Sequence, residues 1–440
     1  MRISTSQIFE GGALGIQNNQ SNLFRLQNQM STGRRMLSPE DDPVAAAQAL
    51  LITQAKEVTG QHMENQKSAS SQLGLVDAQL GSLTDLIQNV RERVIQAGNT
   101  NLDTGNRGAI ATALDAQLIE LVGLANTQNG VGDYLFSGYQ GGTLPFAVSG
   151  AAAVSPAVDS PYAYYGDNGE RLLQVGASRQ LGINVSGNDV FMAAKNGNGS
   201  FAVQTGGNTA GGINQGSAVS TGGSVTDPQQ WASAVNGFAW SDVTKPALQV
   251  RFSVVGAVTT YTLYDISVPA APVALTGGAD VFTPGQAIPL AATGPVQDFG
   301  AQLVVTGQPA DNDTFAITPS TSQSLFQTLQ NIIGLLRTPI GPANTSAEYT
   351  NDLGLQLQGL DRALDNTARV QADVGTRMHE LDTLTSTSED VDLQYATTLS
   401  KLQDLDYVKA ISEFTQQQTQ LEAAQKSFVT VSQLSLFNYL

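Results

Sequence analysis

Residues 31–50 read STGRRMLSPEDDPVAAAQAL and separate two stretches of the chain that have helical hydrophobic patterns. We expect the first helix to end at Gly33, because glycine adopts the left-handed conformation of a helix C-cap without a steric clash. Ser38 and Asp41 have the spacing of a capping box, and the Asp-Pro pair that follows repeats the start signal. The stretch therefore predicts a joint between two helices. The residues predicted to form it are Gly33, Ser38, Asp41, Asp42 and Pro43.

The apolar stripe before the joint is narrow. Ile16, Leu23, Leu26 and Met30 are spaced by seven, three and four residues, which places them on one side of a helix. The positions around them are mostly glutamine and asparagine. Because so narrow a stripe buries little apolar surface, it does not hold a single helix in water, and we expect a partner helix.

The stretch after the joint has the most regular pattern in the chain. Its apolar residues follow one another in steps of three and four: Leu73, Val76, Leu80, Leu83, Ile87, Val90 and Val94. We predict one helix from Pro43 to about Ala97, which at 1.5 Å per residue is on the order of 80 Å long. So long a helix indicates a coiled-coil spine. A shorter helix is predicted from about Arg107 to Asn126.

Helical patterns return in the last third of the chain. A short helix is predicted at 325–336, and a longer one follows it. Ser386 and Glu389 repeat the capping-box spacing, so we predict a second joint at 386–390. The last segment carries another apolar stripe, made of Ile411, Phe414, Leu421, Phe428, Val431 and Leu434.

Between the helical regions the composition changes to glycine, threonine and valine. Leu248, Val250 and Phe252 alternate with polar residues, which is the period of a half-buried strand. We therefore predict a β-rich inserted domain over residues 141–320. The glycine-rich run from Gly197 to Gly223 is interpreted as a mobile surface loop within it.

The order of these elements predicts a mainly α fold with an inserted β-rich domain, in which both chain ends form long antiparallel coiled-coil helices. The predicted domains are a terminal coiled coil (1–38 and 390–440), a helical bundle (39–140 and 321–389) and an insertion exposed on the outside (141–320). Because the terminal stripes are narrow, we expect the terminal coiled coil to become ordered on assembly. Its predicted assembly seam comprises Ile16, Leu23, Leu26, Met30, Ile411, Phe414, Leu421, Phe428, Val431 and Leu434, with Gln418 and Gln425 restricting the register.

Charge and composition exclude several classes of partner. The 440 residues include 21 Lys and Arg against 38 Asp and Glu, a formal net charge of −17, and no cysteine. A net negative charge argues against nucleic acid and an anionic membrane as partners. The lack of cysteine excludes disulfides and thiolate metal sites. The first residues, MRISTSQIFEGGALG, lack the apolar core of a secretory signal, and no stretch reaches the roughly 18 apolar residues of a membrane span, so we expect no membrane insertion.

Residue types for catalysis are sparse. His62 and His379 are the only histidines, each alone on a predicted helix, which argues against a catalytic triad and a multi-histidine metal site. Asp311 and Asp313 flank Asn312 as in a calcium loop, but the glycine and the position-12 glutamate of such a loop do not follow. No glycine-rich segment continues into the Lys-Ser or Lys-Thr of a phosphate loop. We therefore expect no enzyme activity, no metal and no cofactor.

Several motifs point to a known family. Ser-Thr-Gly-Arg-Arg at 31–35, followed by Asp-Asp-Pro-Val-Ala-Ala-Ala at 41–47, resembles the N-terminal signature of bacterial flagellins and flagellar hook-associated proteins. The proline after the paired aspartates is similar to the hook–filament junction branch of that family. The motifs Gly132–Gly138 and Asp311–Phe315, at the predicted edges of the insertion, and the C-terminal Ser435–Leu440 resemble the same branch.

The resemblance implies a secreted, self-assembling structural subunit of the bacterial flagellum. Such a subunit joins hook to filament and is needed for filament assembly and motility. The implied partners are further copies of the chain, the hook-side junction protein (hook-associated protein 1), flagellin, and an export chaperone before secretion. The implied location is the extracellular flagellum, reached by type III export without a cleaved signal peptide. A chain without disulfides is compatible with that route.

Two other functions remain open on the sequence alone. The first is flagellin, the filament subunit, against which Pro43 and the C-terminal Tyr439–Leu440 argue. The second is a secreted adhesin-like binding module on a helical stalk, in which Tyr162, Tyr164 and Tyr165 line a ligand surface. The same tyrosines also fit a hairpin or a core.

Overall fold

The computed structural model of the chain describes residues 5–148, 162–237, 248–268, 271–276, 280–293, 296–341 and 345–437. The chain forms two compact units. One comprises residues 1–67, 174–179 and 381–440, and the other comprises residues 68–173 and 180–380. The predicted fold class, mainly helical with a β-rich insertion, is confirmed. The described strands, β1 to β14, all lie between residues 146 and 319.

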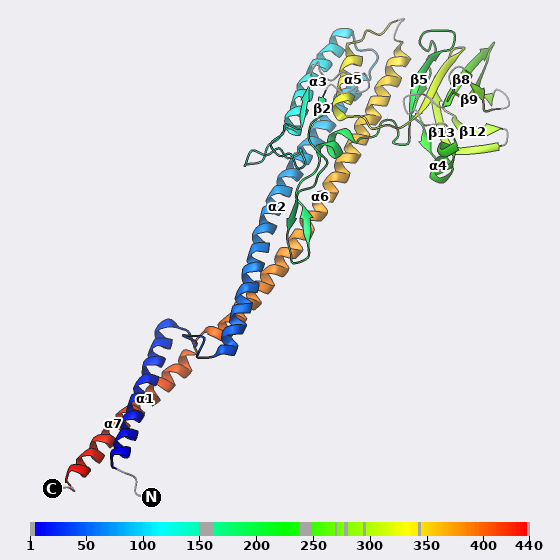
Figure 1. Cartoon of the computed structure of the whole chain (residues 1–440). Helices are drawn as coiled ribbons and strands as arrows, with labels where there is room; N and C mark the ends of the chain where they lie inside the picture. The colour runs from blue at the N-terminus through cyan, green and yellow to red at the C-terminus, as the bar shows by residue number, and fades with distance from the viewer. Residues whose placement is uncertain are drawn as a thin grey trace. The chain divides into compact units, whose positions relative to one another are not determined.

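The first unit contains the two terminal helices, α1 (Thr5–Thr32) and α7 (Tyr407–Phe437). They lie antiparallel, as Figure 1 shows. At one end the ring of Phe9 lies edge-on against the ring of Phe428, with centroids 5.6 Å apart. At the other end the hydroxyl of Tyr407 donates to the carbonyl of Met30 at 3.1 Å. Helices α1 and α7 are therefore in contact at both of these places.

Two long helices continue from the terminal pair. Helix α2 spans Pro43–Ala97, the bounds predicted from the sequence, and α6 spans Ser346–Gln403. Helix α6 passes through Ser386 and Glu389 without a break, and both side chains are exposed. The predicted second joint at 386–390 is therefore wrong. A capping-box spacing starts a helix only where the preceding residues are not already helical, and here the half-buried side of α6 continues on both sides of the motif.

The second unit contains a helical core. Helices α3 (Thr104–Ala125) and α5 (Leu325–Arg337) pack on each other, and their first turns are capped by Asp103 and Ser324, whose side chains accept from the amides of Asn106 and Gln327. The predicted stripe of α2 is fully buried at Leu73, Val76, Leu80, Leu83, Ile87, Val90 and Val94. The predicted stripe thus faces the core, as the three-and-four spacing requires.

Helix α3 is, among the described helices, the one long and apolar enough by composition to cross a membrane. This departs from the sequence-based expectation that no stretch reaches that length. Leu114 and Leu121 of this helix are fully buried, and α3 packs on α5, whereas Ile119 is 71% exposed. Its buried apolar side chains therefore belong to the helical core.

Two short hairpins lie beside the helical core. Strand β1 (Phe146–Val148) pairs with β2 (Tyr162–Tyr164), and β3 (Leu172–Gln174) pairs with β4 (Gln180–Gly182). A five-residue π-helix, η1 (Asn188–Met192), follows them. The aromatic rings of Phe136, Phe146, Phe191 and Phe326 meet with centroids 5.1 to 5.9 Å apart and join these segments to α5.

A β-sandwich occupies the rest of the insertion (Figure 1). One sheet has the order β10-β9-β8-β14-β5, with β11 also on β9, and the other has the order β12-β13-β6, with β7 also on β13. The first sheet contains β5 (Phe201–Asn208), β8 (Leu248–Val255), β9 (Val258–Asp265), β10 (Val273–Ala274), β11 (Asp280–Val281) and β14 (Asp313–Pro319). The second contains β6 (Val219–Ser220), β7 (Ser224–Val225), β12 (Ala287–Thr293) and β13 (Val296–Thr306), with α4 (Pro228–Gly237) packed on β13.

Both sheets of the sandwich share one apolar core. It includes Phe201, Trp231, Phe252, Phe299 and Phe315, each less than a tenth exposed. The alternation predicted for 248–254 is confirmed by β8, because Leu248, Val250 and Phe252 point into this core.

The glycine-rich run 197–223 is ordered, so its interpretation as a mobile loop is wrong. It contains β5 and β6, and its Asn214 is buried and exchanges two hydrogen bonds with the backbone of Thr314, at 2.8 and 3.0 Å. The buried carboxylate of Asp313 accepts from the amides of Gln215, Gly216 and Ala310, each at 2.8 Å. Apart from the bond from Ala310, these bonds join residues about a hundred positions apart in the sequence, which local composition does not reveal.

Candidate assembly site

The terminal helices contact each other through one narrow seam. Its residues are spaced by three and four along each helix and are buried or half-buried: Phe9, Gly12, Ile16, Asn19, Leu23, Leu26 and Met30 on α1, and Ala410, Phe414, Gln417, Leu421, Ala424 and Phe428 on α7. On α1 only Leu26 is less than a tenth exposed among these, and on α7 only Ala410. The described part of the pair therefore buries little apolar surface, as expected from the sequence.

Most residues of the predicted seam lie in this contact. Ile16, Leu23, Leu26, Met30, Phe414, Leu421 and Phe428 line it. Ile411 is 52% exposed and Val431 is 45% exposed, so these two lie outside the contact between α1 and α7. Ala410, one position before Ile411, is the residue of α7 that faces α1 at this level. The side chain of Leu434 lies outside the described residues, and a role of any of these residues in assembly stays a prediction.

The sequence pattern missed the small residues of the seam. A β-carbon built on Gly12 would lie 2.8 Å from the ring of Phe428, so this glycine lets the ring approach the backbone of α1. The three-and-four rhythm, extended backwards from Ile16, reaches Gly12 and then Phe9. This spacing could have identified Gly12 from the sequence. A stripe defined by large apolar side chains leaves a glycine out.

Polar residues within the seam differ from those predicted. Gln418 and Gln425 are exposed, so they do not lie between α1 and α7. Gln417 lies on the seam instead, and its Oε1 is buried without a hydrogen-bond partner among the described residues. A polar side chain in a coiled-coil seam lowers stability and restricts register, and we assign this effect to Gln417.

The joint is built from two segments that pair with each other. Gly33 has a φ of +69°, as predicted for the C-cap of α1. Its carbonyl accepts from the amide of Leu405 at 2.9 Å, and the amide of Arg35 donates to the carbonyl of Gln403 at 2.7 Å. The break between α6 and α7 therefore lies at 404–406, beside the first joint and not at 386–390.

Three aspartates cap the backbone at the joint. Asp42 Oδ1 accepts from the amide of Ala45 at 3.0 Å and so caps α2, whose first residue is Pro43. Asp41 Oδ2 accepts from the amides of Ser38 and Leu37 at 3.0 and 2.9 Å, and these bonds hold the pKa of Asp41 below its usual value. Asp406 Oδ1 caps α7 through the amides of its second and third residues.

The segment from Ser38 to Asp41 is a turn and not the first turn of a helix. The amide of Asp41 donates to the carbonyl of Ser38 at 3.1 Å, and Pro39 lies in that turn. Asp41 reaches back to the Ser38 amide as the acidic residue of a capping box does, but the helix starts after the second signal. The helix starts at Pro43, as the sequence predicts.

A pocket of about 290 Å³ opens at the joint. Its lining includes three basic side chains (Arg25, Arg35 and Lys409), four acidic ones (Asp41, Asp42, Asp406 and Glu413), and the apolar Leu26 and Met36. Arg35 and Asp42 form an ion pair at 3.6 Å across it. The lining holds no histidine, serine, threonine or tyrosine.

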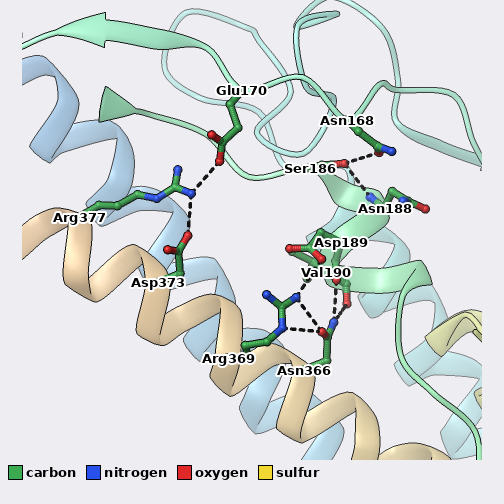
Figure 2. Close-up of polar contacts among 10 residues, drawn as sticks. All are labelled: Asn168, Glu170, Ser186, Asn188, Asp189, Val190, Asn366, Arg369, Asp373 and Arg377. Atoms are coloured by element: carbon green, nitrogen blue, oxygen red, sulfur yellow. Dashed lines mark hydrogen bonds and ion pairs between the residues drawn. The ribbon is translucent and has the colours of Figure 1, made fainter. Parts of the chain in front are cut away.

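A second polar cluster fastens residues 166–192 to α6 (Figure 2). Arg369 pairs with Asp189 at 2.8 Å, and the amide nitrogen of Asn366 donates to the carbonyl of Asp189 at 2.7 Å. Arg377 pairs with Glu170 at 2.7 Å and with Asp373 at 2.6 Å. Burial lowers the pKa of Arg377, but the hydrogen bonds and charges of Glu170 and Asp373 outweigh it and raise that pKa above its usual value. Each cation is matched by a carboxylate, so the cluster is a structural clamp.

The other residues considered for chemistry have structural roles or none. His62 is half-buried on α2, and His379 is exposed on α6. Both carboxylate oxygens of Asp313 are occupied by N–H donors, which leaves the suspected calcium loop without one of its ligands. Within the described ranges, no group of three or more histidine, aspartate or glutamate residues could hold a metal ion.

Two of the three tyrosines considered for ligand binding are held in the fold. The hydroxyl of Tyr164 lies 2.7 Å from the carbonyl oxygen of Asp167, and burial raises its pKa. Tyr162 packs on Phe326, with ring centroids 5.2 Å apart. Tyr165 alone is exposed, at 47%. This arrangement does not favour a ligand surface formed by the three rings.

Comparisons with known proteins agree on one family. Residues 3–141 match the bacterial flagellin N-terminal helical region, and residues 357–440 match the bacterial flagellin C-terminal helical region. Flagellar hook-associated protein 3 of Escherichia coli K12 is 26% identical over 437 residues, which are 99% of this chain and 99% of that protein. The protein of the same name from Salmonella typhimurium LT2 is 24% identical over 438 residues, again 99% of both chains.

A solved structure supports the same grouping. The flagellar junction protein FlgL of Legionella pneumophila superposes with a TM-score of 0.66 at 28% identity, over 81% of this chain and 100% of that one. The two proteins are therefore similar in fold over about four fifths of this chain.

Proposed function

We infer that this chain, which belongs to the family of bacterial flagellins and flagellar hook-associated proteins, is the structural subunit that joins the flagellar hook to the filament. It is a component of the external flagellum and needed for motility, and its family is a structural one. The observation that carries the assignment is the match along nearly the whole chain, from the terminal helices through the insertion.

The terminal pair supplies the mechanism that we propose. Its seam is narrow, half-exposed and interrupted by a polar glutamine, so it is marginal in a lone molecule. Stacked against the terminal pairs of neighbouring copies, the same helices would bury their remaining apolar surface and release water. Order at the chain ends would then be coupled to assembly.

We propose that the partners are further copies of this chain, flagellin on one side and hook-associated protein 1 on the other, with an export chaperone before secretion. A layer of such subunits would present one end of its helical lattice to the hook and the other to the filament. The seam pattern on α1 and α7 supports helix-to-helix contacts between copies of this chain.

A strain that lacks this chain tests the assignment. We expect electron microscopy to show hooks without filaments, and flagellin to accumulate in the medium, because the filament has no base on which to grow. Re-expression of the chain should restore filaments and motility. Normal filaments in the deletion strain would overturn the proposed function, and loss of hooks as well would place the chain earlier in assembly.

A further inference from the structure

The β-sandwich rests on the first turns of α6 through polar contacts. The side chain of Asn351 donates to the carbonyl of Ala218 at 3.0 Å and accepts from the amide of Ser220 at 2.8 Å. Beside it, the hydroxyl of Thr205 donates to Oε1 of Glu348 at 2.5 Å. The apolar core of the sandwich contains no residue of α6 among those described. We call this contact, formed by Asn351 and Glu348 of α6 with Thr205, Ala218 and Ser220 of the sandwich, the seat. Its stability depends on hydrogen bonds and charges.

Glu348, which accepts from Thr205, has a second acidic side chain one turn further along α6. Glu348 and Asp352 lie at positions i and i+4 of α6, where side chains are neighbours and like charges repel. Glu348 Oε2 is buried and has no hydrogen-bond partner in the described chain. Neither carboxylate forms an ion pair with a described residue. Arg107 lies over the ring of Tyr349, the residue that follows Glu348 in the sequence.

The chain crosses between the sandwich and the helices at two adjacent places. The amide of Asn196 donates to the carbonyl of Thr321 at 3.0 Å, and the amide of Gln323 donates to the carbonyl of Ala194 at 2.8 Å. Two neighbouring crossings of this kind can act as a hinge, while the seat on α6 lies elsewhere on the sandwich. Opening the seat would then move the sandwich without unfolding it.

We propose that the Glu348–Asp352 pair makes the contact between the β-sandwich and α6 dependent on pH. The contact is more stable when the pair carries a proton. With both carboxylates ionised, repulsion between them opposes the Thr205 hydrogen bond to Glu348. A proton on Asp352 removes that repulsion and leaves Glu348 free to accept from Thr205. The proposal is independent of the function proposed above, because it concerns a single molecule.

The titration of Asp352 fits this device. Burial first, and the charge of Glu348 second, raise the pKa of Asp352 from 3.8 to about 6. Between pH 3.8 and about pH 6, Asp352 therefore binds more protons when the seat is closed than when it is open. Its stability rises as the pH falls from neutral through about 6, and the gain is complete below the ordinary pKa of 3.8.

Hydrogen exchange of the full chain at pH 5 and pH 8 tests the proposal, read in peptides that contain the Ser220 amide and corrected for the intrinsic pH dependence of exchange. We expect the protection factor to be up to about tenfold higher at pH 5, because linkage with partial solvent screening sets that limit. Peptides from the core strands β8 and β14 should not respond, since they belong to the interior of the sandwich.

Three variants separate the seat from a general effect of pH. In Asp352→Asn the Ser220 amide should be as protected at pH 8 as at pH 5. In Thr205→Val its protection should be lower at both pH values. Asp382→Asn, an exposed carboxylate on the same helix, should behave like the unaltered chain. The proposal is overturned if the unaltered chain shows equal protection at pH 5 and pH 8, or if the pH response persists in Asp352→Asn.

Discussion

Replacement of Phe428 by aspartate is expected to leave the chain folded but to abolish its incorporation into flagella. The ring of Phe428 lies against Phe9 and against the backbone at Gly12, so the carboxylate would enter the closest part of the seam. An unpaired charge in an apolar contact is strongly unfavourable, and the narrow seam has little other apolar surface to compensate. The cores of the second unit do not include Phe428, so they should stay intact.

Two measurements check this expectation. Thermal unfolding of the purified variant should show the main transition unchanged, and complementation of the deletion strain should give no labelled subunits at the hook–filament junction. Phe428→Leu, which keeps an apolar side chain in the seam, serves as the matched control and should assemble. Normal junctions and motility with Phe428→Asp would contradict the role of the seam.

Replacement of Asp313 by alanine is expected to lower the free energy of unfolding of the β-sandwich by about 4 kcal/mol, because four N–H groups lose a buried charged acceptor. The carboxylate is fully buried and accepts from the side chain of Asn208 and the amides of Gln215, Gly216 and Ala310. Its removal takes away part of the hydrogen bonding that fixes the loop at 208–217 to β14, while the two bonds between Asn214 and Thr314 remain. Tryptophan fluorescence during urea unfolding reports the change, since Trp231 lies in the sandwich core.

The matched control lies two residues away. Asp311 is exposed, and its carboxylate accepts from the amide of Val254 at 3.0 Å. Asp311→Ala should therefore cost no more than about 1 kcal/mol. Equal losses in the two variants would show that the effect comes from the turn as a whole and not from the buried carboxylate.

The helical part of the fold could be predicted from the sequence because its signals are local. Helix α2 begins at Pro43 and ends at Ala97 as expected, since the capping aspartate precedes it and its heptad stripe is unbroken. The same kind of signal failed at Ser386 and Glu389, where tertiary packing carries α6 through a capping motif. A capping motif therefore predicts the start of a helix only where the apolar stripe of the preceding residues is also interrupted.

The insertion was harder to predict because its order comes from distant residues. Glycine content favoured a mobile loop at 197–223, while Asn214 and Asp313 fix that loop through bonds across about a hundred positions. The Glu348–Asp352 pair also had no sequence signal, because two carboxylates one turn apart on a helix are usually solvated. Its special character depends on the burial of Asp352 and on the contact of Glu348 with Thr205, neither of which the sequence reveals.

Most of the predicted seam lies in the contact between α1 and α7, while Ile411 and Val431 lie outside it and their role in assembly stays a prediction. The large apolar side chain of Ile411 is exposed, whereas the small Ala410 lies in the contact between α1 and α7. Similarly, Gly12 on α1 makes room for Phe428. Small residues carry the closest approach between helices, yet they contribute little to a hydrophobic pattern.

The central claim is that the terminal helices reach their stable fold only in an assembly. Hydrogen exchange of α1 and α7, measured in the dilute monomer and again in isolated flagella, tests it most directly. We predict rapid exchange in both helices of the monomer, strong protection of the same amides in flagella, and protection of the second-unit part of α2 in both samples. Strong protection of α1 and α7 in the dilute monomer would contradict the claim.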